Sequence, residues 1–290
     1  MISYISVSLT LDKILERATS LGEYFKYSFV RNALAVTVLI ALCAALLGVI
    51  LTLRRFSLIG DGLSHVAFGA AAIAATLGML DFTLTLPITI IAAVLILKGG
   101  EKRRIMGDAI IAIISAGALA IGYLVLDAGG GAANLGGDVC TALFGSSAIL
   151  SIDTGELIFT ALLTAVLVAL TVIFYYKIFS VSFDERFAKA TGTKTGRYNL
   201  AVAIVTAIVI VVGMKLAGAL LMSALIVVPA MSAMRVCKSF KATVTVSALI
   251  AVICATAGVL LSIILETPVG ATVAAMDIIA FALFSLFKKR

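Results

Sequence analysis

The sequence predicts an all-α integral membrane protein, and three observations support this class. Of its 290 residues, 62% are hydrophobic and only 13% are charged, whereas soluble globular domains carry roughly 25% charged residues. The mean hydropathy is +1.22. Long runs rich in Ala, Leu, Ile and Val suit transmembrane helices better than the alternating strands of a membrane barrel. We therefore expect one transmembrane domain over residues 1–290, without a second, soluble domain.

The apolar runs set the number of membrane spans. At about 20 residues per span, this length of chain has room for roughly eight to ten helices. The runs themselves predict nine, and an odd number places the two termini on opposite sides of the membrane. The predicted spans lie near residues 32–53, 60–80, 83–98, 108–127, 156–177, 198–214, 216–234, 243–265 and 270–287.

The segment before the first span mixes charged and apolar side chains. Asp12, Lys13 and Glu16 are interleaved with Ile14 and Leu15. This pattern is typical of a helix that lies on a membrane surface, and a cleaved secretory signal has a different order of charge and apolar core. We expect residues 1–28 to form an amphipathic surface helix.

The basic residues indicate the orientation. If the connections after the first, third, fifth and seventh spans and the C-terminal tail share one side, that side holds 17 of the 22 Lys and Arg residues. Cytoplasmic connections carry such an excess, so the N-terminus and its surface helix are expected outside and the C-terminus inside. The formal charge of +7 then reflects topology and attraction to anionic membrane lipid, and it requires no nucleic-acid partner.

Asp61 and His65, the only histidine, form the main candidate for chemistry. If the second span is helical from Arg54 onward, a rise of ~1.5 Å per residue places them roughly 10 and 15 Å past the cytoplasmic boundary, with His65 near the midplane. A spacing of four puts both side chains on one helical face, within reach of one ion. Nitrogen and oxygen ligands suit Zn²⁺ and also Mn²⁺.

Two ligands leave a coordination shell incomplete, so waters, other carboxylates, backbone or a second copy of the chain would supply the rest. A hydrogen-bonded pair without an ion and a proton relay remain open readings of Asp61 and His65. Asp277, inside the last span, is either a third ligand or a carboxylate paired between helices. Asp108 is expected to be a helix N-terminal charge, and Pro229 to kink the seventh span.

The connection between the fifth and sixth spans contains a stretch too polar to cross the membrane. Ser182 and Glu185 have the spacing of a capping box, and Gly192 is a suitable C-terminal stop, so a short helix is expected over residues 182–192. Phe183 and Phe187 form an aromatic knob on one side of it. Such a helix can dock into a partner's groove or lie flat on the membrane.

Two enzyme classes are disfavoured by missing motifs. The sequence has no G-x-x-x-x-G-K-[ST] phosphate-binding loop, so ATP hydrolysis is not expected of this chain alone. It also has no H-E-x-x-H motif and no second histidine, which argues against a metalloprotease. We therefore expect a protein that is not itself an enzyme.

Four stretches resemble the permease subunits of bacterial ABC importers for zinc and manganese. Residues 53–65 match the pattern R-R-x-S-x-x-G-D-x-L-x-H, and Ser182 to Gly192 match the coupling-helix pattern S-F-D-x-x-x-A-x-x-x-G. The segment from Met214 to Ala230 and the run Thr267-Pro268-Val269-Gly270 are similar to two further signatures. The resemblance thus covers most of the chain, although the outer segment 129–150 matches no motif of the family.

The resemblance implies a homodimeric core in the bacterial cytoplasmic membrane. It also implies two cytoplasmic ABC ATPase subunits and an extracellular metal-binding lipoprotein or periplasmic protein that delivers the ion. Asp61 and His65 would contact the metal in transit, and no cofactor would be bound permanently. The residues expected to engage the ATPase are Phe183, Asp184, Glu185, Phe187, Ala188 and Gly192.

The identity of the cargo and the source of energy stay open at this point. The imidazole favours zinc slightly, while manganese and iron accept the same ligands. A proton-coupled secondary metal transporter would use the same pair of residues, and a permease for a chelated metal would share the architecture.

Overall fold

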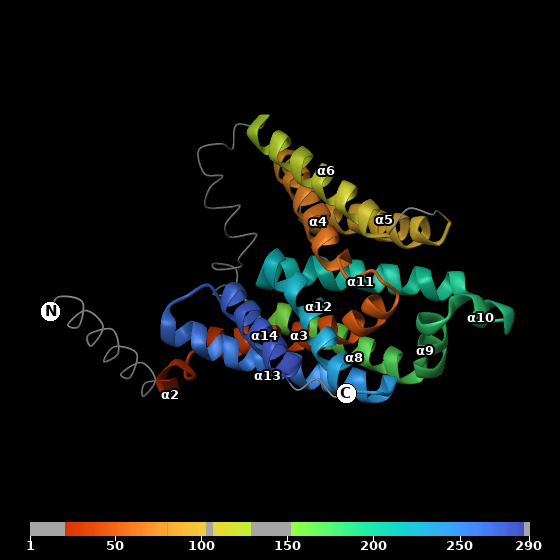
Figure 1. The fold of residues 1–290 in the computed structure, drawn as a ribbon. Coiled ribbons are helices and arrows are strands. Elements are labelled where there is room, and N and C mark those ends of the chain that lie inside the picture. Colours follow the sequence, from red (N-terminus) through yellow and green to blue (C-terminus); the bar gives the residue numbers. More distant parts are fainter. Residues whose placement is uncertain (1–20, 80, 103–106, 129–151, 287–290) are drawn as a thin grey trace.

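The computed structural model describes residues 21–79, 81–102, 107–128 and 152–286, and every regular element in these ranges is a helix (Figure 1). The segment 129–150 and most of the predicted surface helix of residues 1–28 lie outside the described residues. Within the described residues, the short helix α2 (Leu21–Tyr24) precedes the first long helix.

Each of the nine predicted spans coincides with a helix. Seven of the described helices are long and apolar enough to cross a membrane. The other two predicted spans are shorter or more polar, so the expected number of nine is approximate. The nine helices are α3 (Ser28–Leu53), α4 (Ile59–Thr76), α5 (Asp81–Lys102), α6 (Gly107–Ala128), α8 (Thr154–Ile173), α11 (Thr195–Ala217), α12 (Ala219–Val236), α13 (Phe240–Leu265) and α14 (Val269–Leu286).

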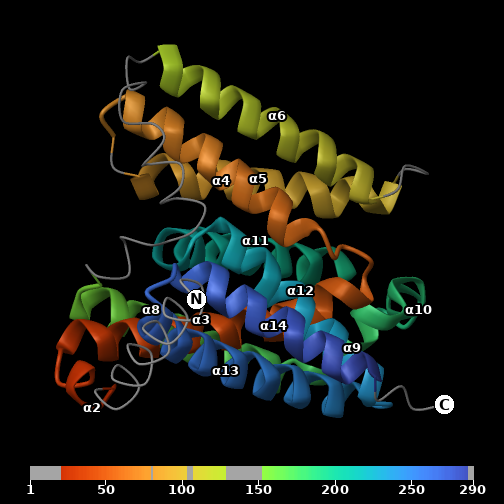
Figure 2. The same cartoon turned by 60° about the vertical axis from the view of Figure 1, so that its left-hand side comes forward.

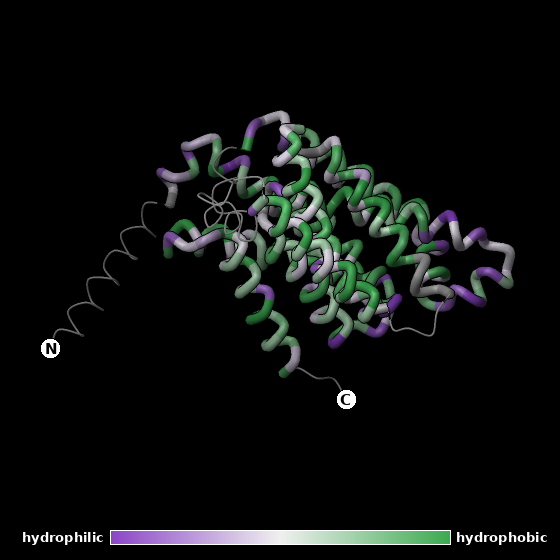
Figure 3. Tube along the Cα trace, turned by 90° about the horizontal axis from the view of Figure 1, so that it is seen from above, coloured by the Kyte–Doolittle hydropathy of each residue, from purple (hydrophilic) through white to green (hydrophobic). Residues whose placement is uncertain are grey.

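The helices form two groups. In Figures 1 and 2, α4, α5 and α6 make a layer on one side, and α11 lies against that layer at the edge of the remaining helices. Helix α3 packs on α8, α12 and α13 and is the most buried of the seven long apolar helices, whereas α6 is the least buried. Figure 3 shows hydrophobic residues along the helices and hydrophilic ones mainly at their ends, as expected for a membrane protein.

Close contacts between helices depend on small and weakly polar residues, which is usual where no hydrophobic effect drives helices together. The Cys43 thiol of α3 lies 3.2 Å from the Thr164 hydroxyl of α8. Gly69 of α4 faces the backbone of α6, where an added Cβ would lie 2.5 Å from the carbonyl oxygen of Ala118. Gly122 of α6 packs directly against Gly69.

Helices α11 and α12 are separated by a single residue, Gly218. Its φ of 90° and ψ of 155° are accessible to glycine and strained for other residues, which explains the glycine at this sharp change of direction. Pro229 lies inside α12, as predicted, and it removes one backbone donor from the helix. Nearby, the Ser232 hydroxyl donates to the Val228 carbonyl at 2.8 Å.

Candidate metal site

The segment that leads to Asp61 begins with a sharp helix end. Arg55 adopts a φ of 62°, and the Phe56 and Arg55 N–H groups donate to the carbonyls of Leu51 and Thr52 at 2.9 and 3.0 Å. This is the hydrogen-bond pattern of a Schellman motif, which terminates a helix. The condition that the second span is helical from Arg54 onward is therefore not met, although its predicted start near residue 60 agrees with the start of α4 at Ile59.

The position of the pair in its helix follows from this. Because α4 begins at Ile59, Asp61 lies in its first turn. Measured from Ile59 at ~1.5 Å per residue, Asp61 and His65 are roughly 3 and 9 Å into the helix, so depths calculated along a continuous helix from Arg54 do not apply. The pair thus lies in the first two turns of α4.

Two glycines fix the backbone on either side of Asp61. A Cβ on Gly60 would lie 3.0 Å from Cδ1 of Ile226, and a Cβ on Gly62 would collide with Cγ2 of Ile111. Ile226 belongs to α12 and Ile111 to α6, so the first turn of α4 is held between these two helices. This close packing determines where the Asp61 backbone sits.

Asp61 and His65 face each other across one helical turn, as the spacing predicted. His65 Nε2 lies 3.5 Å from Asp61 Oδ1. The Asp61 side chain is 55% exposed and that of His65 is 22% exposed, so the carboxylate stands at the open side of the pair. His65 Nδ1 is buried without a hydrogen-bond partner among the described residues, which leaves Nε2 as the nitrogen directed at Asp61.

The separation of these two atoms fits a shared ion. An ion bound at about 2.1 Å to both Nε2 and Oδ1, atoms 3.5 Å apart, would subtend an angle of about 113° between them, near the tetrahedral value preferred by Zn²⁺. An octahedral ion such as Mn²⁺ would need the two atoms slightly closer together. The pair can therefore supply two ligands of one metal ion after little or no side-chain movement.

A third protein ligand is not assembled within the described part of the chain. No group of three or more His, Cys, Asp or Glu residues that could hold a metal was found in it, so Asp277 does not join Asp61 and His65. Neither oxygen of Asp277 has a hydrogen bond of good geometry in the described structure. Its side chain is fully buried, and the Cys254 thiol of α13 is the polar group that it meets across the helix contact, which agrees with the expectation of a polar partner between helices.

The expected coupling segment contains helix α10 (Glu185–Ala190), which follows α9 (Tyr175–Phe183). Its N-cap is Asp184, whose side chain accepts a hydrogen bond from the Phe187 N–H at 3.0 Å. The predicted cap at Ser182 is wrong, because α9 runs on to Phe183 and buries Ser182 inside it. At the other end Gly192 has a φ of 84°, and its role as the stop is confirmed.

The side chains at the junction of α9 and α10 divide into buried and exposed ones. Ala188 of α10 is fully buried, whereas Phe183, the last residue of α9, and Phe187 of α10 are 75% and 63% exposed. Phe183 also stacks on Phe179 of α9 at a centroid distance of 5.8 Å. Both rings are exposed, as predicted, but they belong to two helices and not to one side of the single helix expected over residues 182–192.

An ion pair joins α10 to the segment that carries the candidate site. Arg54 Nη2 lies 3.4 Å from Glu185 Oε2, with the arginine side chain only 6% exposed and that of Glu185 30% exposed. Asn199 of α11 donates to the other carboxylate oxygen of Glu185 at 2.7 Å. Sequence reasoning assigned Arg54 only a topological role and missed Asn199. A polar Asn near the start of an apolar span was the available signal.

The chain was then compared with known proteins. The model of the ABC 3 transport family matches residues 26–289. The manganese transport system membrane protein MntC of Halalkalibacterium halodurans is 24% identical over 92% of this chain and 90% of that protein. The high-affinity zinc uptake system membrane protein ZnuB of Haemophilus influenzae is 25% identical over 89% of this chain and 96% of its own length.

A solved structure has a similar fold. It is described as PsaBC from Streptococcus pneumoniae in complex with Fab, and the matching chain is 26% identical. The superposition has a TM-score of 0.78 and covers 93% of this chain and 95% of that chain.

Proposed function

Because the chain belongs to the ABC 3 transport family, we propose that it is the membrane-spanning permease subunit of an ATP-driven importer for a divalent transition-metal ion, zinc or manganese. The observation that carries this proposal is the pair formed by His65 Nε2 and Asp61 Oδ1, 3.5 Å apart at the entry of α4. Relatives named for manganese and for zinc transport support both metals as cargo.

The incomplete ligand set suits transport. A site with two protein ligands leaves the remaining positions to water or to a second copy of the chain, so the ion can enter and leave by ligand exchange. A complete set of four protein ligands closes the shell, as in structural zinc sites. We therefore assign Asp61 and His65 to a transient binding step, in which the carboxylate and the imidazole hold the ion together.

The remaining parts of the transporter are proposed by analogy with the family. The permease would work as a homodimer in the bacterial cytoplasmic membrane, with the N-terminus outside, and an extracellular metal-binding protein would deliver the ion. Two ATPase subunits would engage the junction of α9 and α10 through Phe183 and Phe187, whose exposure supports a docking role.

The ion pair between Arg54 and Glu185 would link the helix that engages the ATPase to the segment that carries the metal site. A displacement of α10 moves the Glu185 carboxylate, and the paired Arg54 guanidinium transmits that movement to the connection between α3 and α4. Asp61 lies in the first turn of α4, so this connection determines its position. In the proposed mechanism, ATP-driven motion of α10 changes the access to Asp61 and His65.

Metal-resolved uptake in cells tests the site. We expect Asp61→Asn and His65→Ala to reduce zinc or manganese uptake by at least about tenfold, the lower end of losses from disturbing metal ligation. Asp108→Asn is the matched control, because Asp108 is an exposed carboxylate in the first turn of α6. Normal uptake in both site variants would refute the assignment of the pair to the ion path.

The energy source is tested separately. Inactivation of the partner ATPase should abolish uptake, whereas collapse of the proton gradient at constant ATP should leave it intact. The reverse result would favour a proton-coupled transporter that uses the same pair as a relay.

A further inference from the structure

A cavity of about 590 Å³ lies beside the segment that joins α10 to α11, away from Asp61 and His65. Its walls come from α3, α8, α9 and α11 and from residues Thr191 to Lys194. The volume is within the range of roughly 300–1,000 Å³ typical of ligand sites. Nothing in the proposed transport mechanism uses this cavity.

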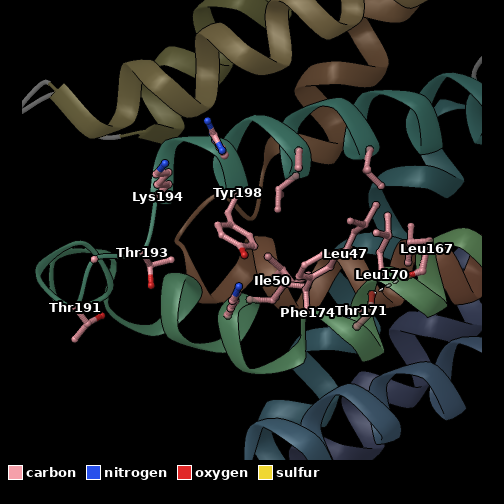
Figure 4. Close-up of a pocket in the computed structure, with 17 residues that line it drawn as sticks. Leu47, Ile50, Leu167, Leu170, Thr171, Phe174, Thr191, Thr193, Lys194 and Tyr198 are labelled. Atoms are coloured by element: carbon pink, nitrogen blue, oxygen red, sulfur yellow. Dashed lines mark hydrogen bonds between the residues drawn. The ribbon is translucent and has the colours of Figure 1, made fainter.

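The cavity has an apolar end and a polar end. Figure 4 shows Leu167, Leu170 and Leu47 at one end, and Thr193 and Lys194 at the other. The ring of Tyr198 lies between them, and it packs edge-on against Phe174 at 6.2 Å. A ligand that fills this space must therefore be amphipathic.

Three cations line the cavity, namely Lys177, Lys194 and Arg197. None of them makes an ion pair in the described part of the chain, and all three are exposed. Glu185, a nearby carboxylate, is instead engaged by Arg54 and Asn199. The polar end thus carries uncompensated positive charge, to which the N-terminus of α11 adds its dipole.

The cavity is also accessible from the side, because Leu170 and Phe174 in its wall are 38% and 36% exposed. From Arg197 to Val205 it follows α11 for about 12 Å, close to the ~15 Å depth of one hydrocarbon leaflet. The apolar end therefore reaches toward the bilayer centre while the cations stay near the headgroup level.

We propose that this cavity binds one anionic glycerophospholipid, with an acyl chain along Leu167 and Leu170 and the phosphate at Lys177, Lys194 and Arg197. Basic pockets between transmembrane helices favour such headgroups. The bound phosphate would lie beside residues 191–194 and would bridge them to α9 and α11. The proposal depends on the membrane setting of the chain and goes beyond its role in metal import.

The sequence contains no tryptophan, which allows a clean test with the full-length chain in phosphatidylcholine vesicles. The variant Tyr198→Trp places a single fluorophore in the cavity. Ile253→Trp, at an exposed apolar position of α13, reports the ordinary lipid shell. Quenching is titrated with chain-brominated phosphatidylglycerol or chain-brominated phosphatidylcholine at equal mole fractions.

For Tyr198→Trp we expect brominated phosphatidylglycerol to reach half-maximal quenching at a mole fraction about fivefold or more below that needed with brominated phosphatidylcholine. The reason is that each nearby cation strengthens the binding of an anionic lipid by about fivefold. Ile253→Trp should show no preference. Adding Lys177→Gln, Lys194→Gln and Arg197→Gln to Tyr198→Trp should remove the preference, whereas adding Lys238→Gln, an exposed lysine outside the cavity, should retain it.

Three results would overturn the proposal. Equal quenching by the two lipids would show an apolar crevice without headgroup recognition, and no quenching by either would show that another occupant, such as a second copy of the chain, fills the space. A preference that survives neutralisation of all three cations would place the headgroup elsewhere. If the triple variant does not fold, the three single variants replace it, and each should weaken the preference.

Discussion

The ion pair between Arg54 and Glu185 can be broken with little change in shape by Glu185→Gln. The substituted side chain keeps one carbonyl oxygen for Asn199, which donates to Glu185 at 2.7 Å, and it removes the charge that faces Arg54 at 3.4 Å. The variant therefore isolates the electrostatic link between α10 and the connection to α4.

The size of the effect follows from burial. Removing one partner of a fully buried ion pair costs roughly 3–5 kcal/mol, and a further interaction of Arg54 places its loss below that range. The Arg54 side chain is 6% exposed but that of Glu185 is 30% exposed, and solvent screening reduces the cost to about 2 kcal/mol. This free energy corresponds to about a 30-fold change in the equilibrium that holds α10 against the connection.

The assay is transport in proteoliposomes that contain the permease and its ATPase partner. For Glu185→Gln we expect ATP hydrolysis to continue while the number of metal ions transported per ATP falls, by up to about 30-fold. The matched control is Arg55→Gln, because Arg55 is exposed and has no ion pair among the described residues. It should transport like the wild type.

A double-mutant cycle gives the decisive result. If the pair transmits motion, Arg54→Gln and Glu185→Gln should be strongly non-additive, with a coupling energy of about 2 kcal/mol. Unchanged metal transport per ATP in Glu185→Gln would refute the reasoning. So would two single variants whose losses simply add.

Three further substitutions test the packing, each read as the midpoint of thermal unfolding in detergent. Gly69→Ala should destabilise the protein by about 1–3 kcal/mol, because the added Cβ would lie 2.5 Å from the Ala118 carbonyl oxygen. The control Gly117→Ala in α6 should leave stability unchanged, because a Cβ there has nothing within 4 Å. Equal midpoints for the two variants would contradict this prediction. Arg55→Gly should stabilise the protein by about 0.5–1 kcal/mol, since the φ of 62° strains a non-glycine residue. A lower midpoint would contradict the strain at Arg55. Asp277→Leu should stabilise by about 1–3 kcal/mol, because it removes two buried oxygens that lack a hydrogen bond of good geometry in the described structure. A loss of stability would show that the contact with the Cys254 thiol holds α13 and α14 together.

The helices were predictable from sequence because each apolar run is long and continuous. The start of α4 was not, since the turn that precedes it contains neither glycine nor proline, and Arg55 takes the left-handed conformation instead. The cap of α10 was misplaced by two residues because Ser182 and Asp184 are both good caps, and only the continuation of α9 to Phe183 decides between them.

The candidate site was partly predictable, because part of it depends only on local helix geometry. Asp61 and His65 are four residues apart on one helix, so local geometry alone brings them together. Arg54 and Glu185 are separated by 131 residues, and no local pattern relates them. Their contact depends on how α3, α9 and α11 pack, which the sequence does not specify without the fold. The cavity was missed because it, too, depends on how these helices pack.

The contact between Gly69 and Gly122 has a consequence for movement. Where two helices meet backbone to backbone, neither side has room for an added methyl group, so the two glycines set the distance between the helix axes. On either side of this contact the helices interlock, through Ile111 of α6 on Gly62 and Phe68 of α4 on Tyr123 of α6, and such surfaces resist shear until their side chains repack. A change of access to Asp61 and His65 should therefore carry α4 and α6 together as one rigid pair.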